Sequence, residues 1–152
     1  MALNKEELRL LLSSEEPNYM AIAAQIGTDS IPALDALSTD AADIMTATKA
    51  VYLSSLLTDS RAHDVVIKAS KSTNALLKIA SASALVNLPD TTKYKIAEKL
   101  ITEENISIQK LVIGSIQTTA SSKLKEQLKT LSTSSSSEFI KNISRQKLVK
   151  IN

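Results

Sequence analysis

The sequence predicts an all-α protein, and three observations support this prediction. Glycine and proline, which mark most β-hairpin turns, are rare, since the 152 residues include two Gly and three Pro. Apolar residues recur at steps of three and four through most of the chain, as in helices with one buried face. Apolar residues also recur about every 32 residues, which indicates a repeated structural unit.

We expect one domain over residues 1–152, built from short helix pairs in which helix A, a turn and helix B follow one another. Residues 1–14 are expected to hold a helix over Lys5–Leu12 that covers the apolar end of the stack of pairs. Asn4 and Glu7 have the spacing of a capping box at the start of this helix. Residues 15–131 are expected to hold four pairs: 15–26 with 29–38, 41–57 with 60–70, 74–88 with 91–102, and 106–119 with 121–131.

Two segments follow the four pairs. Residues 132–137 consist only of Ser and Thr, and we expect a flexible connector there. Residues 138–152 are expected to form a last A helix without a B helix.

Three rows of residues keep this repeat in phase, because the members of each row follow one another at nearly the same interval. The rows are Leu53, Leu85, Ile116 and Leu148; Met45, Leu77, Ile108 and Ile140; and Leu56, Leu88, Thr119 and Ile151. We expect each row to occupy one structural position in successive A helices.

The chain resembles the HEAT-repeat family of α-solenoids, most clearly over residues 77–88, Leu-Lys-Ile-Ala-Ser-Ala-Ser-Ala-Leu-Val-Asn-Leu. This stretch is similar to the A helix of that family, with a basic residue, small residues and a closing Ala-Leu-x-x-Leu. Weaker matches lie at 108–119, where Gln109 takes the basic position, and at 45–56, where Thr46 does. The pattern is shared in part with armadillo repeats, and the helix A proline and much of the Asp/Arg ladder of the family are missing.

The resemblance implies a right-handed α-solenoid of about four to five HEAT-like helix pairs, with A helices on the convex side and B helices on the concave side. It also implies a non-catalytic surface that binds proteins or, less often, nucleic acid. A fold by itself does not decide between these functions.

Charge is unevenly distributed along the chain. Residues 1–64 carry a net charge of −6 and residues 65–152 a net charge of +8. Lysines near the repeat period predict a basic stripe on the concave B-helix face, with Tyr94 close to it: Lys68, Lys95, Lys99, Lys125 and Lys129. Such a stripe attracts acidic partners, although a solvated polar face on amphipathic helices would have the same composition.

The sequence therefore predicts a protein-interaction scaffold or adaptor that binds the acidic surface of another protein. The alternatives are a nucleic-acid-binding solenoid that places the same lysines on phosphates, and an accessory or regulatory subunit of an enzyme. Only three of the 18 basic residues are Arg, which disfavours base and phosphate readout by guanidinium groups. Leu148 and Ile151 give the last helix an apolar end through which a weak homodimer is expected.

No catalytic residue, cofactor or metal is expected. The chain has no Cys, and its one imidazole, His63, is expected to be exposed and without a ligand. Tyr52 and Phe139 are expected in the core, and Gly114 is expected to permit close helix packing. Neither a membrane span nor a signal peptide is recognisable, so we expect a cytoplasmic protein.

Overall fold

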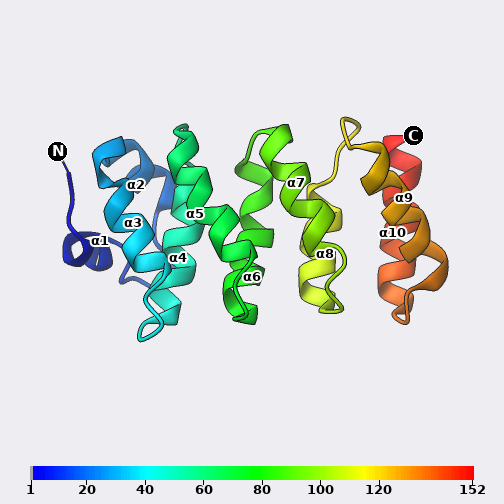
Figure 1. Cartoon of the computed structure of the whole chain (residues 1–152), viewed down its shortest axis with the longest axis horizontal. Coiled ribbons are helices and arrows are strands. Elements are labelled where there is room, and N and C mark those ends of the chain that lie inside the picture. The colour runs from blue at the N-terminus through cyan, green and yellow to red at the C-terminus, as the bar shows by residue number, and fades with distance from the viewer. Residues whose placement is uncertain (1) are drawn as a thin grey trace. The chain divides into compact units, whose positions relative to one another are not determined.

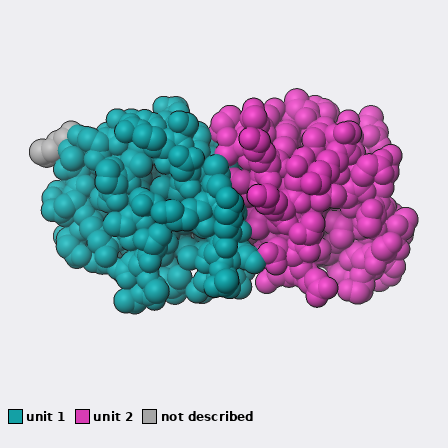
Figure 2. Space-filling view, in the orientation of Figure 1, with its two compact units in different colours: residues 1–88 teal, residues 89–152 magenta. Residues whose placement is uncertain are grey.

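The computed structural model describes residues 2–152, and every regular element in this range is helical. The helices group into two compact units, unit 1 (Met1–Leu88) and unit 2 (Pro89–Asn152), which Figure 2 shows in different colours. Each unit is described by itself below. None of the helices between residues 2 and 152 combines the length and apolar character that a membrane-spanning segment needs.

Unit 1 contains six α-helices and two single-turn 3₁₀ helices (Figure 1). They are α1 (Lys5–Leu11), α2 (Tyr19–Gln25), η1 (Thr28–Ser30), α3 (Ile31–Ser38), α4 (Ile44–Ser55), α5 (Ser60–Ser70), α6 (Ala75–Ala84) and η2 (Leu85–Asn87). Unit 2 contains α7 (Asp90–Leu100), α8 (Ile106–Ser115), α9 (Ser122–Ser134) and α10 (Glu138–Ile151). The all-α prediction is confirmed.

The helix bounds differ from the expected ones mainly at helix ends. Helix α5 coincides with the expected range, whereas the expected helix at 15–26 begins only at Tyr19, where the Asn18 side chain caps α2. Helix α9 continues into the Ser/Thr run, and the Ser132 hydroxyl donates to the Lys129 carbonyl oxygen at 2.6 Å. The connector therefore shrinks to the short segment between α9 and α10, and its last residue, Ser137, caps α10.

Side-chain N-caps begin the four helices that the sequence analysis expects as the later A helices. Helices α4, α6, α8 and α10 begin after Asp43, Asn74, Asn105 and Ser137, which recur at a nearly constant interval in the sequence. In each helix the cap side chain accepts a hydrogen bond from a backbone N–H two or three residues later. These caps give an independent register for the four A helices.

The cap register shifts the first member of all three predicted rows by one residue. Met45 is 62% exposed, while Ile108 and Ile140, its expected equivalents, are buried. Counted from the caps, the buried Thr46 is the true equivalent of these isoleucines. Asp43 and Asn74, the caps of α4 and α6, are therefore 31 residues apart, one fewer than the 32 residues between the row members Met45 and Leu77.

Helices in each unit pack against both their neighbours and their next-but-one helices. In unit 1, α4 contacts α3, α5 and α6, while α3 also contacts α5. In unit 2, α10 contacts α8 and α9, and α7 contacts α9. The core of unit 1 joins α1 to this arrangement through fully buried leucines: Leu8, Leu12, Leu34, Leu37 and Leu53.

Ion pairs attach α1 to the connection between α3 and α4. Arg9 contacts Asp40 at 2.9 Å, Asp43 at 3.3 Å and also Glu6, while Lys5 contacts Asp40 at 3.0 Å. Hydrogen bonds from the Lys5 side chain and from the Ala42 backbone N–H lower the pKa of the Asp40 carboxyl group.

At the start of α5, hydrogen bonds from the Arg61 side chain and backbone lower the pKa of Asp59 to about 2.

We predict that Asp59→Asn weakens the acid sensitivity of the fold. A carboxyl group whose pKa falls on folding stabilises the native state above its ordinary pKa, here 3.8, and this contribution is lost as the pH falls toward 2. Asn still caps the helix but does not titrate. The urea midpoint should therefore drop less between about pH 5 and about pH 2.5 in the variant than in the wild type. An equal drop would contradict this role for Asp59.

Gly114 does not permit close helix packing, so that expectation is wrong. A Cβ built on Gly114 meets no atom within 4 Å, and the residue is exposed near the end of α8. Its φ is negative, since no glycine among the described residues has a positive φ. Neither packing nor backbone geometry within the chain requires a glycine here.

Gly114→Ala is therefore expected to stabilise the protein by about 0.5–1 kcal/mol, because Gly costs this much relative to Ala in a helix. Urea unfolding followed by circular dichroism measures the change. A loss of stability would show that the helix end has a constraint that the structure does not contain.

Candidate functional site

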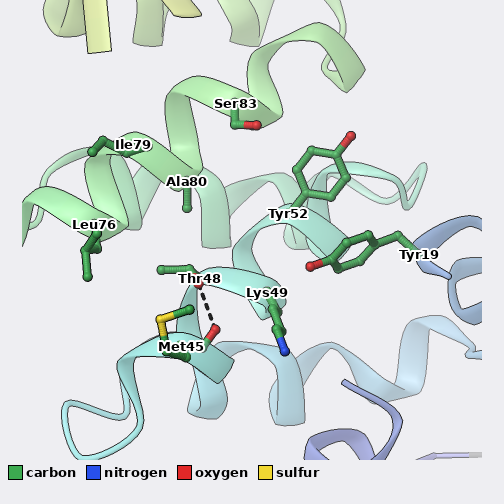
Figure 3. A pocket seen from close by; sticks show the side chains of 9 residues that line it. All are labelled: Tyr19, Met45, Thr48, Lys49, Tyr52, Leu76, Ile79, Ala80 and Ser83. Atoms are coloured by element: carbon green, nitrogen blue, oxygen red, sulfur yellow. Dashed lines mark hydrogen bonds between the residues drawn. The ribbon is translucent and has the colours of Figure 1, made fainter. Parts of the chain in front are cut away.

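An apolar groove lies on the surface of unit 1, between α4 and α6 and beside the first residue of α2 (Figure 3). Its volume is about 440 Å³. The lining residues are Tyr19, Met45, Thr48, Lys49, Tyr52, Leu76, Ile79, Ala80 and Ser83. Most of these side chains are apolar or aromatic, and none is a carboxylate.

The groove is built from equivalent positions of two A helices. On both α4 and α6, the lining residues lie two, five, six and nine residues after the N-cap. These positions form one helical stripe. Other stripes of the same helices are buried against neighbouring helices, so this stripe remains at the surface. Met45 and Leu76, both two residues after a cap, are 62% and 47% exposed.

Two tyrosines close one end of the groove, opposite Met45 and Leu76 (Figure 3). The rings of Tyr19 and Tyr52 make an edge contact, with centroids 4.9 Å apart and planes at 60°. This arrangement is favourable for aromatic pairs. Burial raises the pKa of Tyr19, so its hydroxyl is neutral at physiological pH. No protein group in the described part of the chain hydrogen-bonds either hydroxyl, and both can bond a ligand at the rim.

Lys49 supplies the one cation of the lining, and it has a structural task. Its Nζ donates to the carbonyl oxygens of Leu12 at 2.9 Å and Ser14 at 2.6 Å, which attaches the connection between α1 and α2 to α4. The Thr48 hydroxyl donates to the Met45 carbonyl oxygen at 2.7 Å. The groove can therefore accept apolar side chains and make a few hydrogen bonds, but its residues do not form an acid–base or nucleophile–base pair.

Lys68 is the member of the predicted lysine stripe that lies in unit 1, and an ion pair with Asp35 balances its charge. Lys68 Nζ lies 2.7 Å from Asp35, and Arg61 lies 2.7 Å from Asp59. These cations line a separate surface pocket of about 420 Å³ beside α3 and α5, and Asp35 and Asp64 line it as well. This face of unit 1 carries both signs of charge.

In unit 2, the predicted lysines lie on α7 and α9 around acidic residues. Lys95, Lys99 and Lys129 are exposed, and Lys125 is half-buried. Lys129 pairs with Glu126 at 3.1 Å. Glu98 lies where α7 meets α9, since it accepts a hydrogen bond from the Ser121 hydroxyl and its backbone oxygen accepts one from Gln127. A continuous basic stripe through these lysines and Lys68 stays a prediction.

The aromatic residues differ from their expected roles. Tyr94 is only 7% exposed, and its hydroxyl hydrogen-bonds the Thr119 hydroxyl at 2.8 Å, so its ring is part of the core of unit 2. Tyr52 is half-buried at the groove, and Phe139 is 47% exposed. The expectation of a surface Tyr94 and of core positions for Tyr52 and Phe139 is therefore wrong.

His63 is also placed differently from the expectation. It is buried, and its Nε2 donates to the Leu57 carbonyl oxygen at 2.6 Å, which joins α5 to the turn before it. No group of three or more metal-ligating side chains occurs among residues 2–152.

On α10, Ile151 is buried in unit 2, so the exposed apolar residues of this helix are Phe139 and Val149.

The groove of unit 1 was not predicted from the sequence, because Met45 falls in one of the three predicted rows and Leu76 lies in the pattern of apolar residues at steps of three and four. A signal was present: apolar residues recur two residues after the caps of α4, α6 and α10, beside the buried positions.

Comparison of the chain with family models and with curated proteins finds no match.

We predict that Tyr94→Phe lowers the free energy of unfolding by about 0.5–1.5 kcal/mol, because it leaves the Thr119 hydroxyl without its partner. Urea unfolding of the variant and of Thr119→Val measures this. A double variant that loses about as much as either single variant would assign the loss to the one hydrogen bond. Unchanged stability of Tyr94→Phe would contradict the structural role.

Proposed function

We propose that this chain is a short HEAT-like α-solenoid and acts as a non-catalytic protein-interaction module. Its contact surface in this proposal is the apolar groove between α4 and α6. The observation that carries the proposal is this groove, which leaves Met45 and Leu76 exposed beside two aromatic rings. Contiguous exposed apolar surface of this kind is typical of sites that bind other molecules.

Two features support the repeat part of the proposal. The caps of the four A helices recur at a nearly constant interval, and within each unit alternate helices pack against each other. Both features are typical of solenoids, in which each repeat buries its apolar face against the next. The equivalent lining positions on α4 and α6 fit the same interpretation.

The chemistry of the groove favours a protein segment as its occupant. Its floor is aliphatic at Ile79 and Ala80, and its rim carries the hydroxyls of Tyr19, Tyr52 and Ser83. An amphipathic helix can place apolar side chains, spaced by three and four residues, in such a groove. In this proposal the contact lies on the A-helix side instead of on the lysines of the B helices, and a partner that is an enzyme would use the same surface.

We predict that Met45→Glu combined with Leu76→Glu weakens partner binding by about tenfold or more, because carboxylates would enter an apolar contact. The tagged protein is incubated in extract of its own cells with nuclease, and bound proteins are compared between variants by mass spectrometry. Met20→Glu is the matched control, since Met20 is a 70% exposed methionine of unit 1 outside the groove lining.

A protein that binds the wild type and Met20→Glu, but not the groove variant, supports the proposal. A protein retained equally by all three overturns the assignment of the groove. Recovery of nucleic acid in place of protein, released by moderate salt, would instead indicate the nucleic-acid-binding function.

A further inference from the structure

Unit 2 contains a second groove, between α8 and α10, at the equivalent place on its A helices. Its volume is about 280 Å³, and its lining residues are Lys110, Ile113, Gly114, Phe139, Ile143, Gln146, Lys147 and Lys150. Phe139 lies two residues after the cap of α10, as Met45 and Leu76 do in α4 and α6. It is likewise exposed, at 47%.

The charge of this groove distinguishes it from the first one. Three lysines line it, and no carboxylate does. Neither Lys110 nor Lys150 has an ion-pair partner within residues 2–152, and Lys110 Nζ lies 6.0 Å from the centre of the Phe139 ring. Exposed apolar atoms therefore lie beside unneutralised positive charge.

The third lysine and the glycine shape one end of the groove. Lys147 Nζ donates to the Ile116 carbonyl oxygen at 2.9 Å, and burial together with the charge of Lys150 lowers the pKa of Lys147. A bound anion would relieve this repulsion. Gly114 lines the same groove, and a side chain there would meet only open space. The glycine weakens α8 and keeps this end of the groove open.

We infer that the groove between α8 and α10 binds an acidic segment of a partner protein. An apolar side chain of that segment packs against Phe139 and Ile143, and its carboxylates face Lys110, Lys147 and Lys150. This inference rests on the proposed protein-interaction function, but it concerns a different surface and a partner of different charge. Charge complementarity with an apolar centre is typical of specific protein interfaces.

The lining favours a protein segment over single-stranded nucleic acid. Bases stack on exposed aromatic faces, whereas this floor is formed by Ile113 and Ile143, and Lys110 lies near its single aromatic ring. The lining also has no Arg, the residue best suited to bidentate phosphate contacts. An aliphatic floor instead suits Leu, Ile or Phe of a peptide.

The test uses a synthetic amphipathic peptide of Glu, Leu and Phe, with the apolar residues at helical spacing, titrated against the full chain by NMR and fluorescence anisotropy. We expect amide shifts centred on Gly114 and Phe139 and a raised pKa of Lys147 in the complex. Replacing the Leu and Phe by Ser, or the Glu by Lys, should weaken binding by about tenfold or more, since each removes one of the two attractions.

Two pairs of variants locate the site. Lys110→Glu with Lys150→Glu should weaken binding by about tenfold or more, whereas Lys95→Glu with Lys99→Glu changes net charge equally and should weaken it by less than about threefold. Gly114→Met fills the groove and should abolish binding, while Gly114→Ala, which adds only a Cβ, should retain it. Circular dichroism confirms that each variant is folded.

Absence of binding, shifts outside α8 and α10, or equal effects of the two lysine pairs would overturn the inference. Stronger binding of a single-stranded oligonucleotide at the same residues would overturn it in favour of nucleic acid. The variant Met45→Glu with Leu76→Glu should bind the peptide normally. The extract-binding test of the groove between α4 and α6 and the peptide titration of the groove between α8 and α10 can therefore fail independently of each other.

Discussion

The short length of the helices is the constraint on which the rest of the structure depends. The longest helix of residues 2–152 has 14 residues, and α1 and α2 have seven each. Helices of this length are marginal in water by themselves, so their stability comes from tertiary packing. A helix such as α4 meets this need by contacting α3, α5 and α6 at once. These contacts use most of its circumference and leave one narrow stripe outside, and the grooves form where two such stripes lie side by side.

The N-caps determine where each stripe begins. Asp43, Asn74, Asn105 and Ser137 each satisfy backbone N–H groups that would otherwise lack a partner at the start of a helix. Since a helix turns by a fixed angle per residue, residues at the same distance from their cap occupy equivalent angular positions on their helices. The same four positions after the cap therefore line the groove on both α4 and α6. In α4 and α6, the cap and the residues that line the groove therefore follow the same local pattern.

Each of the two grooves lies between two helices that begin with a side-chain cap, and the grooves differ in charge. Residues 1–88 carry a net charge of −3 and residues 89–152 a net charge of +5. In unit 1 the lining cation, Lys49, is held by backbone carbonyls, whereas Lys110 and Lys150 in unit 2 have no such partner among the described residues. Two pairs of helices can thus present an apolar groove with one tethered cation and a groove with three lysines, because exposed positions are free to vary while buried positions are constrained by packing.

The sequence by itself determined the helical class and several helix ends, because periodicity and capping are local properties. Helix α5 was predicted to the residue, with Asp59 before it. Only the tertiary structure decided which apolar residues are buried. Met45, Leu76 and Phe139 follow the same periodicity as core residues, yet no neighbouring helix in their own unit covers them. Tyr94 lies between two lysines in the sequence but is buried, and Thr119, a residue distant in the sequence, bonds its hydroxyl. Periodicity shows which residues share a face of a helix, whereas burial depends on which other segments reach that face.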